Sequence, residues 1–258
     1  MKIWMFSWLV IFFILIGLSL PGCSSPAPAE SPAQGSPASI APPPQHAPVY
    51  SSAAATADQP AIGTEGNLKL PEAKLKGEVS LEEALAARRS IRQYSTAPLS
   101  LSDVSQLLWA AQGITDSSGK RTAPSAMATY PLEIHLVAGN VEGLAAGVYL
   151  YVPSGHELKK IKDGDFRKEI SRMPAAQNGA IDIVITGNLD KFARFGENGI
   201  RFICLEAGHA AQNICLQATA LNLGTVTTAG FSEEQVKTVL GITGNKTVLY
   251  IMPVGKKT

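Results

Sequence analysis

The 258-residue sequence has few cysteines, almost no excess of charge of either sign, and none of the common nucleotide-binding or metal-binding motifs. With three cysteines in all, it cannot build the dense disulfide framework of a small secreted domain. Histidine, cysteine and carboxylate residues do not occur at the spacing of metal ligands, so no metal site is predicted. The motifs GxGxxG and GxSxG are absent, which argues against a dinucleotide-binding fold and against an α/β-hydrolase.

The charge balance also excludes a class of partner. The sequence has 22 lysines and arginines against 21 aspartates and glutamates, a net charge of +1. Such a balance does not supply the general basic surface of a nucleic-acid-binding protein, so no nucleic-acid partner is expected. The composition, 45% hydrophobic, suits a globular protein, but this average covers three unlike regions.

The N-terminal region, 1–23, has the pattern of a membrane-inserting segment. Lys2 precedes an apolar run over 3–20 that is broken only by two serines and one glycine. The stretch LSLPGCSS that follows resembles the lipobox of bacterial lipoproteins, and the resemblance implies that Cys23 is acylated and becomes the first residue. We expect an exported, membrane-anchored lipoprotein of the bacterial cell envelope or periplasm, with an uncleaved transmembrane anchor as the alternative.

A linker rich in proline, alanine and serine is expected over 24–77. Over 24–60 these three residue types dominate, and only Glu30 and Asp58 carry charge. Without apolar periodicity, and with prolines that lack backbone donors, this stretch cannot build a core. Its expected role is a spacer between the membrane and a folded domain, and a proline-rich binding motif is the alternative. Residues 61–76 look like a transition into folded structure.

The third region, 78–258, is long enough for one hydrophobic core, and function is expected there. Ser80 and Ser100 each precede a helical pattern as N-cap residues, with an acidic residue three positions on, as in a capping box. Because strand and helix patterns interleave without a regular βαβ repeat, the predicted class is α+β, with a central mixed or antiparallel sheet flanked by helices. Further helices are expected at about 200–223 and 232–240, and strands at 132–138, 147–153, 181–187 and 247–255, the first two strands as a hairpin.

The expected long helix, 200–223, has small residues in its middle that would let another backbone approach closely. They are Ala207, Gly208, Ala210 and Ala211. We expect this helix to be a central packing or dimer helix.

The same helix carries two cysteines and a histidine. Cys204 and Cys215 would lie about 16 Å apart along the helix axis, too far to pair, so both are expected to be small buried hydrophobic residues. His209 has Glu206 and Asn213 near it in the sequence. We expect His209 to be a hydrogen-bonded packing residue, with a catalytic role as the alternative.

The stretch RRSIRQYS, 88–95, gathers three arginines and two serines in eight positions. Guanidinium groups offer forked, charge-assisted donors, which suit a phosphate better than ammonium groups do. The four residues Arg88, Arg89, Ser90 and Arg92 stand where a helix closes and turns into a loop, so several of them could converge on one anion. The alternative is a solvated basic helix end that is favoured by the helix dipole.

Four segments, taken in order, resemble the nitroreductase-like FMN oxidoreductases. They are RRSIRQYSTAPLS, RTAPSAMATYPLEIHLV, EAGHAAQNICLQATALNLGTVTTAGF and MPVGK. Within that family they resemble most the azoline dehydrogenases, which oxidise cyclised serine, threonine or cysteine residues of modified peptides. The resemblance implies an α+β nitroreductase-like fold and an obligate homodimer with two FMN sites built across its interface.

Carried over by position, the resemblance assigns cofactor contacts to nine residues and names no catalytic side chain. Arg88, Arg89 and Ser90 would hold the FMN phosphate and ribityl chain, Arg92 would reach the pyrimidine edge of the flavin, and Lys256 would return to the phosphate. Ser125 would come from the partner subunit. Thr228, Ala229 and Gly230 would pass the flavin N5 with their backbone groups.

Two positions depart from the family pattern. Azoline dehydrogenases carry a lysine and tyrosine pair before the long helix, thought to act in proton removal, and Arg194 and Phe195 stand in the matching places. Phenylalanine has no proton to transfer and arginine does not lose its own, which argues against azoline oxidation. Met127 stands where many relatives have glycine and could narrow the substrate face.

The predicted function is therefore that of a membrane-tethered FMN-dependent oxidoreductase. The reaction would be hydride transfer at flavin N5 on an unknown small-molecule or peptide substrate. The alternative is a catalytically degenerate lipoprotein that binds flavin or interacts with the cell envelope.

Overall fold

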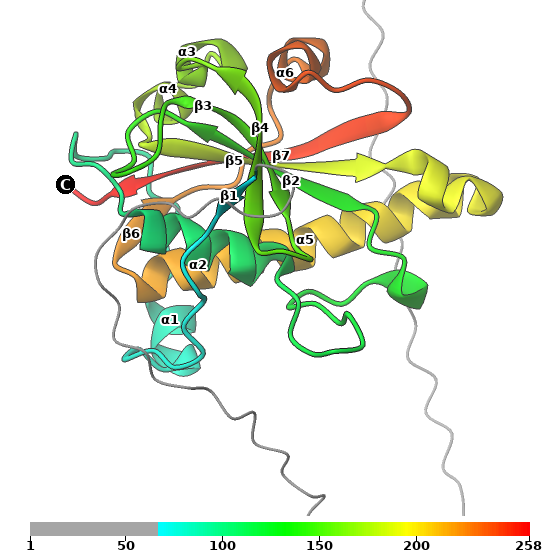
Figure 1. Ribbon diagram of the computed structural model, residues 1–258, viewed down its shortest axis with the longest axis horizontal. Helices are drawn as coiled ribbons and strands as arrows, with labels where there is room; N and C mark the ends of the chain where they lie inside the picture. Colours follow the sequence, from blue (N-terminus) through cyan, green and yellow to red (C-terminus); the bar gives the residue numbers. More distant parts are fainter. Residues whose placement is uncertain (1–66) are drawn as a thin grey trace, which may run out of the picture. The chain divides into compact units, whose positions relative to one another are not determined.

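The computed structural model describes residues 67–258. The expected membrane segment with Cys23, and the linker up to residue 66, lie outside the described residues. The described residues contain an antiparallel sheet of seven strands in the order β1-β4-β3-β2-β5-β7-β6 (Figure 1). The strands are β1 (Leu68–Lys69), β2 (Leu132–Ala138), β3 (Gly147–Val152), β4 (Glu157–Asp163), β5 (Ile181–Asn188), β6 (Leu223–Thr225) and β7 (Lys246–Lys256).

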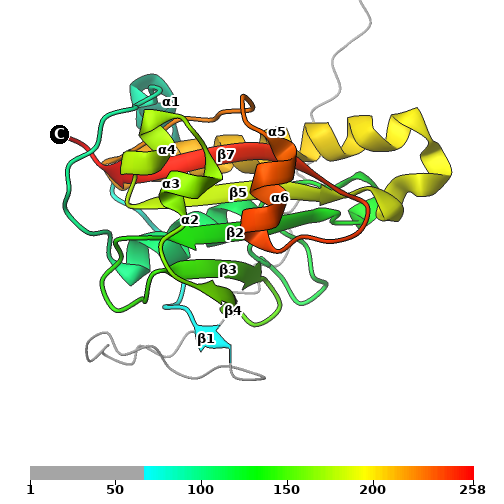
Figure 2. The ribbon, with the colours of Figure 1, turned by 90° about the horizontal axis from the view of Figure 1, so that it is seen from above.

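Helices cover both faces of this sheet, as Figures 1 and 2 show. One face carries α1 (Leu81–Ala87), α2 (Leu101–Gln112) and α5 (Glu197–Ala220), and the other carries α3 (Arg167–Ile170), α4 (Pro174–Asn178) and α6 (Glu233–Leu240). Two short 3-10 helices, η2 (Ala126–Ala128) and η3 (Leu189–Phe195), precede β2 and α5. None of the helices within 67–258 is both long and apolar enough to cross a membrane. The predicted α+β class, with a sheet flanked by helices, is confirmed.

The strands divide their side chains between two hydrophobic cores, because successive residues of a strand point to opposite faces. In β5, Ile181, Ile183 and Ile185 lie in the core beneath α2 and α5. Val184 lies instead in the core beneath α3, α4 and α6. β5 is thus buried on both faces, as expected of a central strand.

Both predicted serine caps are confirmed. Ser80 Oγ accepts from the Glu83 N–H at 3.2 Å, and Glu83 Oε2 accepts from the Ser80 N–H at 2.8 Å, which completes a capping box. Ser100 Oγ accepts from the Asp103 N–H at 3.0 Å. α1 therefore begins where the sequence predicts, and it ends at Ala87, directly before the arginines.

The four predicted strands and their hairpin are confirmed, but the structure adds three strands and moves a helix boundary. The sequence pattern does not predict β4, because its ELKKIKD sequence is rich in lysine, which strands disfavour. α5 ends at Ala220 rather than at 223. The helix stops there because Asn222 has a left-handed φ of 55°. Directly after it, Leu223 begins β6 and pairs with Lys256 of β7.

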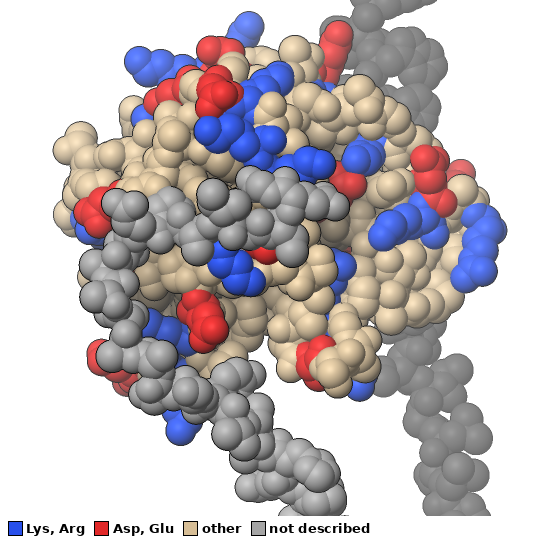
Figure 3. Space-filling view, in the orientation of Figure 1, with Lys and Arg blue, Asp and Glu red and all other residues tan. Residues whose placement is uncertain are grey.

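β4 forms most of one sheet edge, because β1 pairs only with Glu157 and Leu158. Lys159 and Lys160, on the part that β1 does not cover, are exposed. Charged side chains on an edge strand oppose its pairing with another chain. In the view of Figure 3, which has the orientation of Figure 1, basic side chains gather in the upper middle of the molecule, with acidic ones among them.

The folded domain begins before residue 78, the boundary that the composition predicts. Leu70 is 2% exposed, and its N–H donates to the His156 carbonyl at 3.1 Å. The Gln106 side chain accepts from the Lys74 N–H at 2.8 Å and donates to the Lys74 carbonyl at 3.1 Å. One buried leucine and these paired backbone groups attach the end of the expected linker to the domain.

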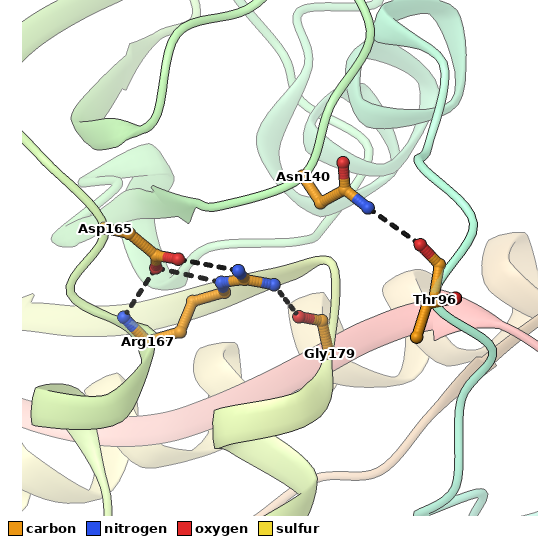
Figure 4. A network of polar contacts seen from close by, with 5 residues as sticks. All are labelled: Thr96, Asn140, Asp165, Arg167 and Gly179. Carbon is orange, nitrogen blue, oxygen red and sulfur yellow. Dashed lines mark hydrogen bonds and ion pairs between the residues drawn. The ribbon is translucent and has the colours of Figure 1, made fainter.

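A polar network supports the segment that follows the arginines (Figure 4). Arg167 forms a bidentate ion pair with Asp165, through Nε at 2.9 Å and Nη2 at 2.6 Å, and Nη1 donates to the Gly179 carbonyl at 2.6 Å. In the loop after β2, Asn140 Nδ2 donates to the Thr96 carbonyl at 3.0 Å. Arg167 thus holds the turn before β5. Asn140, in the loop after β2, holds Thr96, which directly follows RRSIRQYS.

Candidate functional site

The arginine stretch, 88–95, lies along the ends of β6 and β7. The Ile91 N–H donates to the Thr225 carbonyl of β6 at 2.9 Å. The Ser95 N–H donates to the Lys256 carbonyl of β7, also at 2.9 Å. The backbone of the stretch is therefore fixed to the sheet at two points, four residues apart.

Tyr94 fastens the same stretch from its side chain. Its hydroxyl donates to the Ile91 carbonyl at 2.8 Å and lies 3.3 Å from the Pro253 carbonyl. Burial raises the pKa of Tyr94, so the hydroxyl stays a donor. The ring packs over glycines, since a Cβ on Gly255 would lie 2.7 Å from Tyr94 Cβ, and one on Gly224 would lie 3.2 Å from Cε1. A larger residue at either glycine would push the stretch off the sheet.

Three of the four side chains predicted to hold the cofactor in this stretch are available to a ligand, and Arg89 is the exception. Arg88 is half-buried, Ser90 and Arg92 are exposed, and within 67–258 none of these three side chains makes a hydrogen bond or ion pair. Arg89 folds back instead, and its Nη1 donates to the carbonyls of Ala86 and Arg88 at 2.8 Å each. Arg89 is therefore a basic residue at a helix end, which was the alternative interpretation for all four residues.

Lys256 and the segment 228–230 border the same strands. Lys256 is exposed at the end of β7. Thr228 pairs with Ile251, five residues earlier in β7, which is about 17 Å at the rise of a strand. Ala229 and Gly230 are exposed, and a Cβ added to Gly230 would meet nothing within 4 Å. The structure thus brings eight of the nine predicted contacts to β6 and the adjoining part of β7.

Ser125, the ninth predicted contact, lies elsewhere in the chain. It belongs to the 121–130 loop and lies beside Glu206 of α5, whereas the arginine stretch is held beyond the C-terminal end of α5. Glu206 and the helix end at Ala220 are about 21 Å apart along the axis. In Figure 1 the segment after α1 and the green η2, which Ser125 precedes, lie toward opposite ends of α5. One chain therefore carries two separate halves of the predicted site.

The 121–130 loop has an unusual backbone. Met127, Ala128 and Tyr130 have φ angles of 54°, 51° and 46°, in the left-handed region that costs a residue other than glycine about 1–2 kcal/mol. Such conformations need surrounding contacts to hold them and concentrate at functional sites. Met127 thus has a backbone that suits glycine, and its exposed side chain lies with Sδ 3.8 Å from Arg194 Nη2.

Arg194 and Phe195, which the resemblance places where azoline dehydrogenases carry lysine and tyrosine, lie beside this loop. The Arg194 guanidinium stacks on the Phe195 ring at 4.7 Å from its centroid. Arg194 is exposed and Phe195 packs against the core beneath α5. Phenylalanine has no proton to transfer and arginine stays protonated, so neither side chain can act as a base here.

Beneath the loop lies a buried polar network that sequence patterns do not reveal. Arg121 Nη1 donates to Gln112 Oε1 at 2.9 Å, and Gln112 Nε2 donates to Glu206 Oε1 at 3.4 Å. Gln112 is fully buried and Glu206 is 2% exposed. Burial raises the pKa of Glu206 and lowers that of Arg121. The sequence singles out Glu206 only as a neighbour of His209.

One face of α5 is exposed and partly apolar. Leu205 is 56% exposed and Ile200 39%. Ala207 and Ala210 pack into the core of their own chain, whereas a Cβ added to Gly208 would meet nothing within 4 Å. The small-residue centre of the helix thus serves two purposes, internal packing through the alanines and an open outer face at Gly208.

Three expectations for α5 have different outcomes. Cys215 is buried, as predicted, but Cys204 is exposed, although the two lie on nearly the same side of the helix. α1 contacts α5, and Arg88 lies near Cys215 toward the end of that helix. His209 is exposed in the single chain and makes no hydrogen bond within 67–258, so it has no packing partner among the described residues.

Comparisons with known proteins agree with this geometry. The model of the family described as "Nitroreductase family" matches residues 85–256. A protein of Methanocaldococcus jannaschii that is named as a nitroreductase is 38% identical over 201 residues, covering 76% of this chain and 99% of its own. The trifolitoxin operon protein TfxC of Rhizobium leguminosarum bv. trifolii is 26% identical over 195 residues, and the match spans 67% of this chain and only 54% of TfxC.

A solved structure shows the same fold. The crystal structure of a protein from Ralstonia eutropha, described as a nitroreductase, matches with a TM-score of 0.66 and 25% sequence identity. The match covers 81% of this chain and 98% of that one. The chain therefore belongs to the nitroreductase family of flavin-dependent oxidoreductases, as the resemblance of its four segments predicts.

Proposed function

We propose that this protein is an FMN-dependent oxidoreductase. The observation that carries the proposal is a set of donors without partners beside β6 and β7: the guanidinium groups of Arg88 and Arg92, the Ser90 hydroxyl and the Lys256 ammonium group. No acidic side chain within 67–258 forms an ion pair with these cations, so their charge is available. Cationic and hydroxyl donors on a fixed backbone suit a phosphate dianion, which the cofactor carries.

The phosphate would be held by Arg88, Ser90 and Lys256. Arg89 could add the N–H groups that do not donate to the carbonyls of Ala86 and Arg88. The backbone bonds of Ile91 and Ser95 to the sheet hold this group of side chains before any ligand arrives. Such preorganisation lowers the cost of ordering them on binding.

The flavin ring would lie toward Arg92 and the 228–230 segment. A positive charge near the pyrimidine edge stabilises the reduced cofactor, which carries negative charge there, and so raises its potential. Gly230 has open space where a side chain would be, which allows a close approach of the backbone. The cofactor supplies hydride exchange at N5, while the chain supplies binding, orientation and charge.

We also propose a homodimer in which the exposed face of α5 packs against a second copy. Ser125 and the arginines are too far apart to share one cofactor within a chain. An antiparallel pair of α5 helices would bring the Ser125 loop of one subunit to the arginine stretch of the other. The exposed apolar residues on this side of the molecule, Leu205 of α5 with Leu81 and Leu85 of α1, would be covered in such a pair.

The substrate would be a small molecule or a peptide. Arg194 and Phe195 in place of the lysine and tyrosine of azoline dehydrogenases argue against azoline oxidation, because neither residue can remove the proton. Outside the cytoplasm the protein would not meet nicotinamide donors. A quinol, a thiol or another protein would then have to reduce the flavin.

The proposal is tested by adding FMN to the full chain purified in detergent. We expect a yellow protein with one FMN per chain. After anaerobic reduction with dithionite, quinones or nitroaromatic compounds should reoxidise the flavin. A colourless protein that does not bind FMN would exclude the proposal. A protein that binds FMN but passes electrons to none of these acceptors would favour a flavin-binding protein without turnover.

Membrane tethering through Cys23 is proposed from the sequence alone, since this part of the chain lies outside the described residues. A radioactive fatty acid supplied to the producing cells should label the wild-type protein and not Cys23→Ser, which should accumulate as an uncleaved precursor. Label on Cys23→Ser, or none on the wild type, would overturn lipidation at this cysteine.

A further inference from the structure

Glu206 is a buried carboxyl group that the structure leaves partly unsatisfied. It lies in the middle of α5 and is 2% exposed. Its Oε1 accepts from Gln112, whereas Oε2 has no hydrogen-bond partner among residues 67–258. Leaving a buried polar atom without a partner is costly, so each such atom in a folded protein calls for an explanation.

The Ser125 hydroxyl lies beside this carboxyl group and opens the strained part of the loop. Ser125 Oγ accepts from the Tyr130 N–H at 2.8 Å, across the left-handed residues Met127 and Ala128. One O–H and one further lone pair of Ser125 then remain to be used. Glu206 is the neighbouring group that can either accept that O–H or donate into that lone pair.

We propose that Glu206 is a positioning residue whose protonation state sets the direction of the Ser125 hydroxyl. Ionised Glu206 can only accept, so it turns the Ser125 O–H inward. Neutral Glu206 donates to Ser125 Oγ, and the Ser125 O–H then turns outward as a donor to the flavin. This role rests on the proposed function, because it assumes that Ser125 contacts the cofactor of the partner subunit. Glu206 exchanges one proton with the solvent, and no other covalent bond forms or breaks.

Groups from each neighbouring element act on this carboxyl. Burial raises the pKa of Glu206 and is the largest effect. Hydrogen bonding from Ser125 and Gln112 lowers the pKa and favours the ionised form. The positive charges of Arg121, linked to Glu206 through Gln112 of α2, and of Lys191 of η3 act in the same direction. Arg121 also stacks 4.4 Å over the Tyr130 ring, which keeps it beside the loop. Glu206 therefore changes charge at a higher pH than an exposed glutamate, with the loop held in place around it.

The first test needs no cofactor. Glu206 has its ordinary pKa near 4.5 in the unfolded chain and a raised pKa in the folded protein. Its contribution to the free energy of unfolding is therefore full below about pH 4.5 and is lost as the pH rises through the folded pKa. Glu206→Gln, which is neutral at every pH, should remove this loss from the pH profile of unfolding. The exposed Glu142→Gln is the matched control and should follow the wild type.

The second test measures the flavin midpoint potential of the FMN-loaded full chain on both sides of this transition. In the wild type, the preference for reduced over oxidised FMN should fall by about tenfold when the Ser125 donor turns away. For a two-electron couple this is a shift of about 30 mV. Glu206→Gln retains a donor toward Ser125, so its potential, measured relative to that of free FMN at the same pH, should keep the low-pH value throughout. Ser125→Ala should also lack the shift, and Glu206→Gln added to it should change nothing more.

The outcomes separate this inference from the proposed function. If FMN binds, and the potentials of wild type and Glu206→Gln show the same pH dependence, the role of Glu206 is wrong and the proposed function stands. If the shift persists in Ser125→Ala, Glu206 acts by another route and the inference is again wrong. If the wild type does not bind FMN, both are overturned.

Discussion

Replacing Arg88 by alanine is expected to weaken FMN binding by about one to two decades and to leave riboflavin binding nearly unchanged. Arg88 is half-buried at the end of α1, and its guanidinium group makes no ion pair within 67–258. A charge-assisted hydrogen bond contributes about 1.5–3 kcal/mol, and every 1.4 kcal/mol is a factor of ten in Kd. Riboflavin lacks the phosphate and has no such bond to lose. Titration of both ligands by flavin fluorescence measures the difference.

Arg92→Ala is the matched variant, because it removes an arginine of the same stretch that has the other proposed role. It should retain much of the FMN binding but lower the midpoint potential, since the reduced cofactor loses a positive charge near its pyrimidine edge. If Arg92→Ala instead lost FMN affinity and Arg88→Ala lowered the potential, Arg92 would contact the phosphate and Arg88 the flavin edge. If Arg88→Ala binds FMN as tightly as the wild type and Arg92→Ala keeps its potential, the stretch is a solvated helix end and the site assignment is wrong.

Replacing Gly208 by leucine is expected to separate the proposed dimer and to remove most of the bound flavin with it. Gly208 stands at the middle of α5, where two antiparallel copies of this helix would cross. A Cβ there meets nothing within 4 Å in its own chain, so we expect leucine to clash with the partner. Overpacking a tight contact costs about 1–3 kcal/mol, and both subunits carry the change. Light scattering gives the mass, and absorbance gives the flavin content.

Gly77→Leu is the control for this variant, because a Cβ at Gly77 also meets nothing within 4 Å. It should leave the dimer and its flavin unchanged. The Gly208→Leu chain should itself stay folded, since leucine is a better helix former than glycine in a helix interior. A Gly208→Leu protein that remains dimeric and fully loaded with FMN would show that the α5 face packs elsewhere.

Elements with local signals could be predicted from the sequence. The Ser80 and Glu83 capping box lies within four residues, and the hydrophobic pattern of 181–187 needs no partner to be recognised. β4 and β6 could not be predicted in this way. Lysine-rich β4 is a strand because β3 pairs with it, and three-residue β6 is one because Leu223 pairs with Lys256, 33 positions further along the chain. Pairing between distant segments overrides local propensity.

The sequence by itself determined which donors the site has and the order of the segments that carry them, and these were enough to indicate the family. Only the tertiary structure decided which donors remain available. Arg89 binds the end of α1, whereas Arg88 and Arg92 are unpaired. Ser125 lies beside the middle of α5, about 21 Å along the axis from the helix end near the arginines. Residue type is set at each position alone, but burial and pairing depend on residues far apart in the chain. The burial of Glu206 likewise depends on a distant segment, the loop around Ser125, some 80 positions earlier in the chain. A local sequence pattern therefore does not reveal it.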